Sequence, residues 1–201
     1  MARRVGLFIM TLVVTSLLTA CASSVSPPSR YMLPVVSPSD VPASPQTHIQ
    51  VNLPRLAHYL DVDGIVFQLD DIEMREAREH QWADTLASQL ERNLRGKLAQ
   101  ALPSIRFSRA DGPSDETLSL HLDVDEFQGR YDGYAIASGQ WQLRGSENTL
   151  LHLDSFQTRT ALSDDGYPAL VRALGQSWAD VAQDIAQTLK QRGYTQTSPS
   201  Q

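Results

Sequence analysis

A run of leucines at four-residue intervals, followed at once by a proline, most strongly limits the folds open to this chain. Between about Ala77 and Leu102 the apolar residues fit the period of an α-helix that buries one stripe against a partner. Pro103 ends the pattern, because proline lacks the amide hydrogen that a helix interior needs. Short apolar segments at 64–69 and 104–108 fit β-strands. We therefore predict a crossover unit, in which the helix joins two parallel, paired strands.

Alternating apolar and polar residues predict the other strands. The alternation is clearest at 47–53, 117–127, 134–144 and 150–162, and the turns between the last three contain glycine, which suits hairpins. A shorter apolar segment at 30–36 adds one more predicted strand. Hairpins give antiparallel pairs, whereas the crossover gives a parallel pair, so the sheet should be mixed.

A second long helix is predicted from Pro168 to Arg192, with proline in its first turn and Gly193 directly after its end. Each helix has one apolar stripe that a sheet can cover. The fold class is therefore α/β: a single domain with a twisted, mixed β-sheet and two long amphipathic helices packed on it. The expected domain comprises residues 30–193, and a polar tail follows at 194–201.

The first twenty residues, 1–20, have the features of an export signal. Two arginines are their only charges, and the apolar run 5–18 is shorter than the roughly 20 residues that a membrane-spanning helix needs. Residues 18–21 (LTAC) look like a bacterial lipobox. We predict signal cleavage between Ala20 and Cys21 and lipidation of Cys21. The alternative is an incidental cysteine after an ordinary signal peptide.

The segment after the cleavage site is interpreted as a lipid-anchored tether. Residues 21–29 are polar and contain two prolines, so they favour a semi-extended conformation. Two or three acyl chains anchor a protein stably, whereas one chain binds a membrane marginally. Residue 22 is alanine and not the aspartate that often retains lipoproteins in the inner membrane. We therefore expect an outer-membrane protein, lipid-anchored on the periplasmic side.

Composition excludes several classes of function. The chain has 201 residues, a formal net charge of −6 and a pI of about 5.3, so nucleic acid is not an expected partner. Its single cysteine can form neither an internal disulfide nor a multi-thiolate zinc site. The sequence predicts no cofactor and no metal.

One set of polar side chains suggests chemistry. His121, Asp123 and Asp125 alternate on one strand face, and His152 and Asp154 could lie on a neighbouring strand. Histidines and carboxylates brought together in this way can bind a metal ion or exchange protons. The simpler interpretation is the polar outer face of an antiparallel sheet. On balance we predict no catalytic residues and no enzyme.

Three further features invite a functional interpretation. Ser177, in the sequence GQSWA, weakly resembles a nucleophile elbow, but it falls inside the predicted helix and is expected on the helix surface. The acidic segments 61–64 and 70–73 are separated by an apolar strand, so we interpret them as solvated turns and not as a calcium loop. Tyr131 and Tyr134, at a predicted hairpin turn, are candidate partner contacts, with turn packing as the alternative.

Seven short segments, in order along nearly the whole mature chain, resemble the ABC-type transport auxiliary lipoprotein family. The common order makes the resemblance specific, although each segment alone is weak. Met32 departs from the pattern, because an aromatic residue is common there. The segments are Ser29-Arg30-Tyr31-Met32-Leu33, Ile49-Gln50-Val51-Asn52-Leu53-Pro54, Tyr59-Leu60-Asp61, Gly64-Ile65-Val66, Glu79-His80-Gln81-Trp82-Ala83-Asp84-Thr85-Leu86, Asp123-Val124-Asp125-Glu126-Phe127 and Asp165-Gly166-Tyr167.

This resemblance implies a non-enzymatic accessory or docking subunit of an MCE/ABC-type lipid transport system between the inner and outer membranes, which supports membrane integrity. The implied partners are an MCE-domain protein anchored in the inner membrane, ABC-type or Pqi-like transporter components, and the outer-membrane lipid bilayer, reached through acylated Cys21. A homo-oligomer would suit this role. Two alternatives stay open: a structural lipoprotein that assists outer-membrane barrel or cell-wall assembly, and a periplasmic hydrolase dependent on His121 or Asp123.

Overall fold

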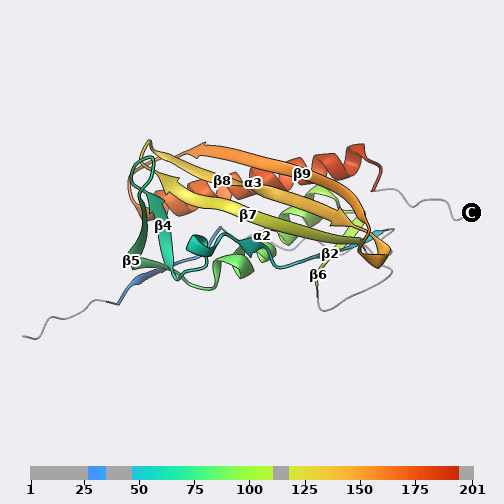
Figure 1. Cartoon of the computed structure of the whole chain (residues 1–201), viewed down its shortest axis with the longest axis horizontal. Helices are drawn as coiled ribbons and strands as arrows, with labels where there is room; N and C mark the ends of the chain where they lie inside the picture. Colours follow the sequence, from blue (N-terminus) through green and yellow to red (C-terminus); the bar gives the residue numbers. More distant parts are fainter. Residues whose placement is uncertain (1–26, 35–46, 111–117, 195–201) are drawn as a thin grey trace, which may run out of the picture.

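The computed structural model describes residues 27–34, 47–110 and 118–194. The predicted export signal, Cys21, most of the predicted tether and most of the predicted tail lie outside these residues. The described part forms one mixed sheet with two long helices packed on it (Figure 1), which confirms the predicted fold class. Among the described residues, neither helix combines the length and the hydrophobicity that crossing a membrane requires.

Nine strands and two long helices make up the described fold. Two short 3-10 helices, η1 (His58–Leu60) and η2 (Ser146–Asn148), lie in connections. The long helices are α2 (Leu86–Ala101) and α3 (Tyr167–Gln191). The strands are β1 (Ser29–Tyr31), β2 (Thr47–Val51), β3 (Arg55–Leu56), β4 (Gly64–Gln68), β5 (Met74–Trp82), β6 (Ile105–Arg109), β7 (Leu118–Arg130), β8 (Tyr134–Arg144) and β9 (Leu150–Ala161).

Strand β7 lies inside the sheet and pairs with other strands along both of its edges. One of its edges pairs antiparallel with β8, and β8 pairs antiparallel with β9, as the hairpin turns predicted. The other edge pairs in parallel with β2, β3 and β4 in succession, from the start of β7 to its end. In this register Ile49 lies opposite Leu118, and Arg55 lies opposite Asp123. The segment between β2 and β3 is therefore held beside the first half of β7.

The predicted crossover is wrong in its pairing. Strands β4 and β6 run in the same direction, but β7 and β2 lie between them in the sheet. The order along this path is β1-β5-β4-β7-β2-β6. Helix α2 therefore connects β5, on one side of β7, with β6 on the other.

The start of the first helix is also wrong. Residues 77–82, predicted as helix, belong to β5, which pairs antiparallel with β4 and parallel with β1. Asp70 begins the turn before β5, since its side chain accepts hydrogen bonds from the amides of Ile72 and Glu73. The resulting hairpin gives the backbone of β5 its hydrogen-bond partners. The helix begins only after Thr85, whose hydroxyl caps it.

Helix α3 follows its prediction and is fixed to both α2 and the sheet. The indole of Trp178 is fully buried, and its Nε1 donates a hydrogen bond to the Leu90 carbonyl of α2 at 3.0 Å. The rings of Phe127 and Phe156 meet it edge to face, each with centroids 5.9 Å away. Trp178 therefore packs α3 against both α2 and the sheet.

The chain after β1 binds both helices. The Leu33 amide donates to Gln89 of α2 at 2.9 Å, and Asn93 of α2 donates to the Pro34 carbonyl at 2.7 Å. A Cβ atom at Gly175 of α3 would lie 2.6 Å from the Pro34 ring, so only glycine allows this approach. The segment is thus part of the folded body.

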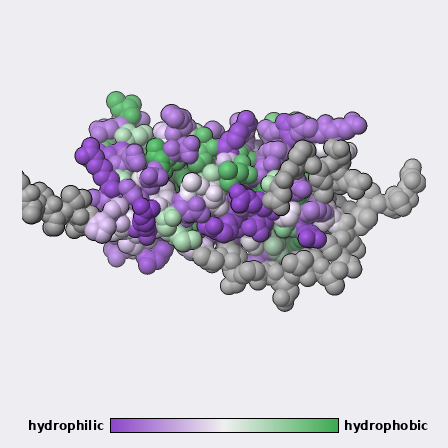
Figure 2. Space-filling model, turned by 90° about the horizontal axis from the view of Figure 1, so that it is seen from below, coloured by the Kyte–Doolittle hydropathy of each residue, from purple (hydrophilic) through white to green (hydrophobic). Residues whose placement is uncertain are grey.

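The described chain starts and ends at opposite ends of an elongated body (Figure 1). Strand β1 lies beside β5 at one end, and the last turn of α3 lies at the other. Tyr194, the first residue of the predicted tail, still packs against the core, and its hydroxyl donates to the Leu151 carbonyl at 3.3 Å. Seen from below, the surface is mainly hydrophilic, with apolar side chains gathered near its middle (Figure 2).

Candidate functional site

The two histidine-containing sets lie on opposite faces of the sheet. His121 of β7 is opposite Gln142 of β8, on the face away from the helices. His152 of β9 is opposite Leu143, which is buried beneath the helices. The structure therefore does not bring these histidines together. No group of three or more His, Cys, Asp or Glu side chains in the described ranges is placed to hold a metal ion.

The aspartates of the two histidine-containing sets either have a structural role or are exposed. Arg55 donates two hydrogen bonds to the Asp123 carboxylate, from Nε to Oδ1 at 2.5 Å and from Nη2 to Oδ2 at 3.0 Å. Asp154 lies 3.9 Å from Nε2 of His152 and is largely exposed. The ring of His152 packs against Trp141, with centroids 4.7 Å apart. The polar-face interpretation therefore fits β7, whereas His152 belongs to the core.

Ser177 lies inside α3, as predicted, but it is buried and not on the helix surface. Its hydroxyl bonds with the Thr160 hydroxyl at 2.8 Å, and Thr158 donates to its carbonyl at 3.1 Å. The prediction was wrong because α3 crosses close to β9, and a small polar residue fits that contact. Ser177 fastens the helix to the sheet.

The two tyrosines near the β7–β8 turn differ in their surroundings. Tyr134 is half-buried, and the guanidinium carbon of Arg159 lies 3.6 Å from its ring centroid. Arg159 also pairs with Asp132 in the turn, at 3.1 Å. Tyr134 therefore packs the turn, while Tyr131 is 56% exposed. A partner contact at either residue stays a prediction, as does lipidation of Cys21.

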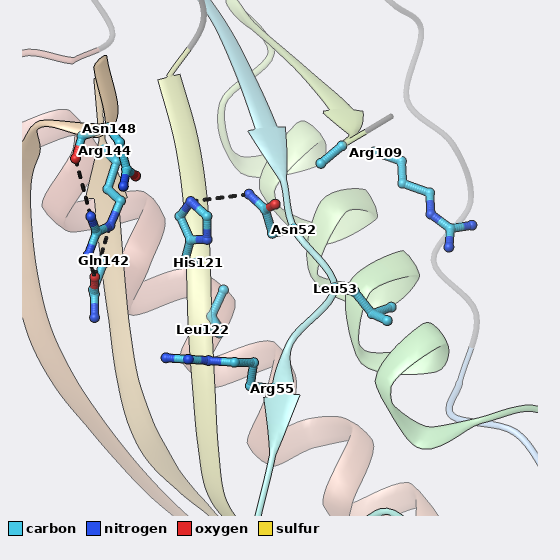
Figure 3. Close-up of a pocket in the computed structure, with 10 residues that line it drawn as sticks. Asn52, Leu53, Arg55, Arg109, His121, Leu122, Gln142, Arg144 and Asn148 are labelled. Atoms are coloured by element: carbon cyan, nitrogen blue, oxygen red, sulfur yellow. Dashed lines mark hydrogen bonds between the residues drawn. The ribbon is translucent and has the colours of Figure 1, made fainter. Parts of the chain in front are cut away.

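An open cavity of about 500 Å³ occupies the outer face of the sheet, near the start of β7. Figure 3 shows side chains from the β2–β3 connection, β3, β6, β7, β8 and η2 around it. Three of its residues are arginines, and none is acidic. The main polar and apolar contributors are Asn52, Leu53, Arg55, Arg109, His121, Gln142, Arg144 and Asn148.

The arginines of the cavity are held to different degrees. Arg144 is fixed by the Gln142 side chain, which accepts from Nη2 at 2.7 Å and from Nε at 3.1 Å, and by the Asn148 carbonyl at 3.2 Å. Arg55 is paired with Asp123. Arg109 is exposed and makes no ion pair with the described residues. Among the described residues, the guanidinium groups of Arg109 and Arg144 therefore lack a carboxylate partner.

His121 contributes a polar group of low charge. Its Nε2 lies 3.0 Å from the Ser119 hydroxyl and 3.4 Å from Asn52 Nδ2 (Figure 3). Burial lowers the pKa of His121 below its ordinary value, and the positive charges of Arg144 and Arg55 lower it further. The imidazole is therefore neutral near pH 7, and the positive charge of the cavity comes from the arginines.

Sequence reasoning missed this cavity. Alternation correctly placed Arg144 and Gln142 on the outward side of β8. Arg55 and Arg109 carry no comparable signal, because they come from a two-residue strand and from the end of a short one. The register of β7 with β3 and β8 puts Arg55 and Arg144 on either side of the cavity, whereas Arg109 lies at the end of β6, opposite Val51, and its side chain points away from His121 (Figure 3).

Relatives with similar sequences and structures are known. The intermembrane transport lipoprotein PqiC of Escherichia coli (strain K12) is 31% identical over 176 residues, which cover 86% of this chain and 92% of PqiC. PqiC of Shigella flexneri gives the same values. A crystal structure of an uncharacterized protein matches with a TM-score of 0.72 at 29% identity, covering 82% of this chain and 99% of that one.

A crystal structure of a Xanthomonas campestris protein shares the fold, with a TM-score of 0.68 at 22% identity, covering 85% of this chain and 99% of the other. Residues 31–186 match the family model for the ABC-type transport auxiliary lipoprotein component. That match includes all of the sheet from Tyr31 onward and most of α3. The chain therefore belongs to the ABC-type transport auxiliary lipoprotein family.

Proposed function

We propose that this protein is a non-enzymatic accessory subunit of a lipid transport system between the inner and outer membranes. It is anchored in the outer membrane through acylated Cys21 and faces the periplasm. There it docks an MCE-domain protein that is anchored in the inner membrane and works with ABC-type or Pqi-like transporter components. The observation that carries the proposal is the 31% identity with an intermembrane transport lipoprotein over 86% of this chain.

The arrangement of the described chain supports a docking role. Strand β1, which follows the tether in sequence, lies at one end of the body, so a tethered anchor leaves the other end free to point into the periplasm (Figure 1). The length of β7 alone is about 40 Å, since it has 13 residues with a rise of roughly 3.3 Å each. The body therefore has one end near the anchor and one end away from it, and Tyr131, directly after β7, lies at the end near β1.

A non-enzymatic role agrees with the positions of the side chains that suggested catalysis. His121 and His152 are on opposite faces of the sheet, and Ser177 is buried against β9. Tyr131 is the candidate partner contact, because it is an exposed aromatic residue on a turn. Self-association into a ring would suit a docking site at the end of a transport assembly.

In-cell crosslinking followed by capture of the full-length lipoprotein and mass spectrometry tests the proposal. We expect an MCE-domain protein among the captured proteins, and we expect it to be lost in a Cys21→Ala variant that is expressed at the same level. A Tyr131→Ala variant, which keeps Cys21, should weaken capture without moving the protein from the membrane fraction. Tyr134→Ala serves as its comparison, since Tyr134 is engaged by Arg159.

The same experiment identifies the main alternative. Capture of an outer-membrane barrel protein or of a cell-wall protein, with no MCE-domain protein, would favour a structural role in envelope assembly. Capture that is the same with and without Cys21 would contradict the anchored docking subunit.

A further inference from the structure

Strand β9 leaves one long edge of the sheet unpaired. It has 12 residues, lies at the upper border of the sheet in Figure 1 and, among the described residues, pairs only with β8. The other strands with a single partner are short, since β1, β3 and β6 have three, two and five residues. Proteins commonly protect a long edge with proline or lysine, and β9 contains neither. Such an edge is a template for a further strand.

The pairing of β9 with β8 shows which main-chain groups are open. The amide of Leu162, directly after β9, donates to the Gly133 carbonyl at 3.0 Å and therefore faces β8. From there the register is unbroken as far as His152, and alternate residues of an antiparallel strand face opposite edges. The amides and carbonyls that point away from β8 are therefore those of Leu153, Ser155, Gln157, Arg159 and Ala161.

The open stretch has a defined extent. The Tyr194 hydroxyl donates to the Leu151 carbonyl at 3.3 Å, so the edge is already occupied just before Leu153. Within the stretch, the Ser155 amide donates to the neighbouring Asp154 carboxylate at 2.8 Å. Residues 153–161 span about 30 Å at roughly 3.3 Å each. An extended segment of about nine residues would cover this edge.

The helix side of this edge is acidic. Ser177 of α3 bonds with Thr160 of β9 at 2.8 Å, so this side of α3 lies beside β9. Asp180 and Asp184 follow three and seven residues later, which places them on the same side of the helix, and both are exposed. Asp154 of β9 adds a third, largely exposed carboxylate. Among the described residues, no lysine or arginine forms an ion pair with any of these aspartates.

The other face of the same edge is apolar at its start. Leu153 is 50% exposed and lies opposite Gln142, on the face away from the helices. Leu150 is also 50% exposed and lies opposite Arg144. An added strand would therefore direct alternate side chains toward carboxylates on one face and toward leucine on the other. Basic side chains suit the first face, and apolar side chains suit the second.

A second copy of this chain fits the edge poorly. Antiparallel pairing of two β9 strands would continue the sheet and place the two α3 helices on the same face. Asp180 and Asp184 of one copy would then approach the same residues of the other, and like charges repel. Strands β1, β3 and β6 are too short to cover the open stretch. The edge thus suits a different protein.

We propose that the open edge of β9 binds, by strand addition, an extended segment of a partner protein in which basic and apolar side chains alternate. The free main-chain groups would supply the hydrogen bonds, and the aspartates and leucines would select the side chains. That the partner is the transport partner rests on the proposed function.

A labelled probe peptide added to the full-length mature lipoprotein in nonionic detergent tests the proposal. The probe has nine residues that alternate lysine and valine, and its counterpart has glutamate in place of each lysine. Fluorescence anisotropy should show that the lysine peptide binds at least tenfold more tightly than the glutamate peptide. Hydrogen exchange at the amides of Gln157 and Arg159 should slow when the lysine peptide binds.

Two substitutions with matched controls locate the binding. Gln157→Pro removes an edge amide without removing a hydrogen bond to β8, so it should weaken the lysine peptide at least tenfold, whereas Gln157→Thr keeps the amide and should bind normally. Asp184→Asn should weaken binding about threefold. Asp71→Asn, at an exposed turn far along the chain, should not. If Gln157→Pro lowers the melting temperature, Asp184→Asn and hydrogen exchange decide the result.

Other outcomes would overturn the proposal. Equal binding of the two peptides would remove the charge match, and binding unchanged by both Gln157→Pro and Asp184→Asn would remove the edge as the site. A photocrosslinking residue at position 157 that captures only further copies of this chain in cells would assign the edge to self-association.

The docking role is decided separately. An MCE-domain protein that is still captured in cells by the Gln157→Pro lipoprotein would leave docking intact and overturn the assignment of the edge to the transport partner. Absence of that protein from the capture by the unchanged lipoprotein, with the peptide results as expected, would contradict the docking role and leave the strand-addition site in place.

Discussion

The contact between α2 and α3 depends on one buried side chain, Trp178. A Trp178→Phe substitution keeps an aromatic ring between Phe127 and Phe156 but removes the Nε1 donor to the Leu90 carbonyl. The lost hydrogen bond costs about 1 kcal/mol, since helical carbonyls such as Leu90 keep their partner within the helix. The smaller ring leaves a gap that costs about 1–2 kcal/mol more. We therefore expect the free energy of unfolding to fall by about 2–3 kcal/mol.

Chemical denaturation followed by far-ultraviolet circular dichroism measures this loss. Trp141→Phe is the matched control, because Trp141 is also buried but its indole nitrogen makes no hydrogen bond with the described residues. That variant loses ring size alone and should cost about 1–2 kcal/mol. If Trp178→Phe costs no more than Trp141→Phe, the hydrogen bond does not stabilise the helix pair and the reasoning fails.

Three other predictions concern the stability of the fold. Gly139→Ala should lower the free energy of unfolding by about 3 kcal/mol in thermal melts, because its Cβ would lie 2.0 Å from a main-chain carbonyl oxygen of β7. Gly133 has open space around it and a φ of +81°, so Gly133→Ala should lower that free energy by about 1 kcal/mol. Burial lowers the pKa of His48 and His121 below 6.5, so the unfolded chain binds more protons in acid. Stability should therefore fall as the pH drops below about 6.5, and His121→Gln should make that fall shallower in a series of melts at different pH. Thr85→Ala removes the cap of α2 and should lower the unfolding free energy by about 1 kcal/mol; no change on denaturation would contradict the capping role.

Elements defined by local pattern were predictable from the sequence. Helix α3 has an apolar stripe over its whole length, a proline at its start and a glycine after its end, so nothing outside the segment is needed to identify it. The hairpins of β7, β8 and β9 follow in the same way from alternation and glycine-containing turns.

Features that depend on distant partners were not predictable. Ala77 and Trp82 continue the apolar pattern of α2, but pairing with β4 and β1 makes this segment a strand. The hairpin turn at Asp70 places the following segment beside β4, and the helix begins only after that segment ends. Periodicity alone does not report such a partner.

The candidate cavity illustrates the same limit. Arg55, Arg109 and Arg144 are far apart in sequence, and each looks like an ordinary surface residue of a strand. Arg55 and Arg144 line the same cavity because β7 pairs with β3 on one edge and with β8 on the other, and Arg109 lies at its border from β6, which pairs with β2. The anchor shows the opposite case, because residues 18–21 carry the whole lipobox pattern and Cys21 could be proposed from sequence alone.

The most direct measurement of the central claim is the rate at which labelled phospholipid moves between the inner and outer membranes in cells. Cells that lack this protein should show slower transfer, and the full-length chain should restore the rate. A Cys21→Ala chain, expressed equally, should not restore it. An unchanged rate in cells without the protein, together with impaired assembly of outer-membrane barrels, would contradict a transport role and favour the structural alternative.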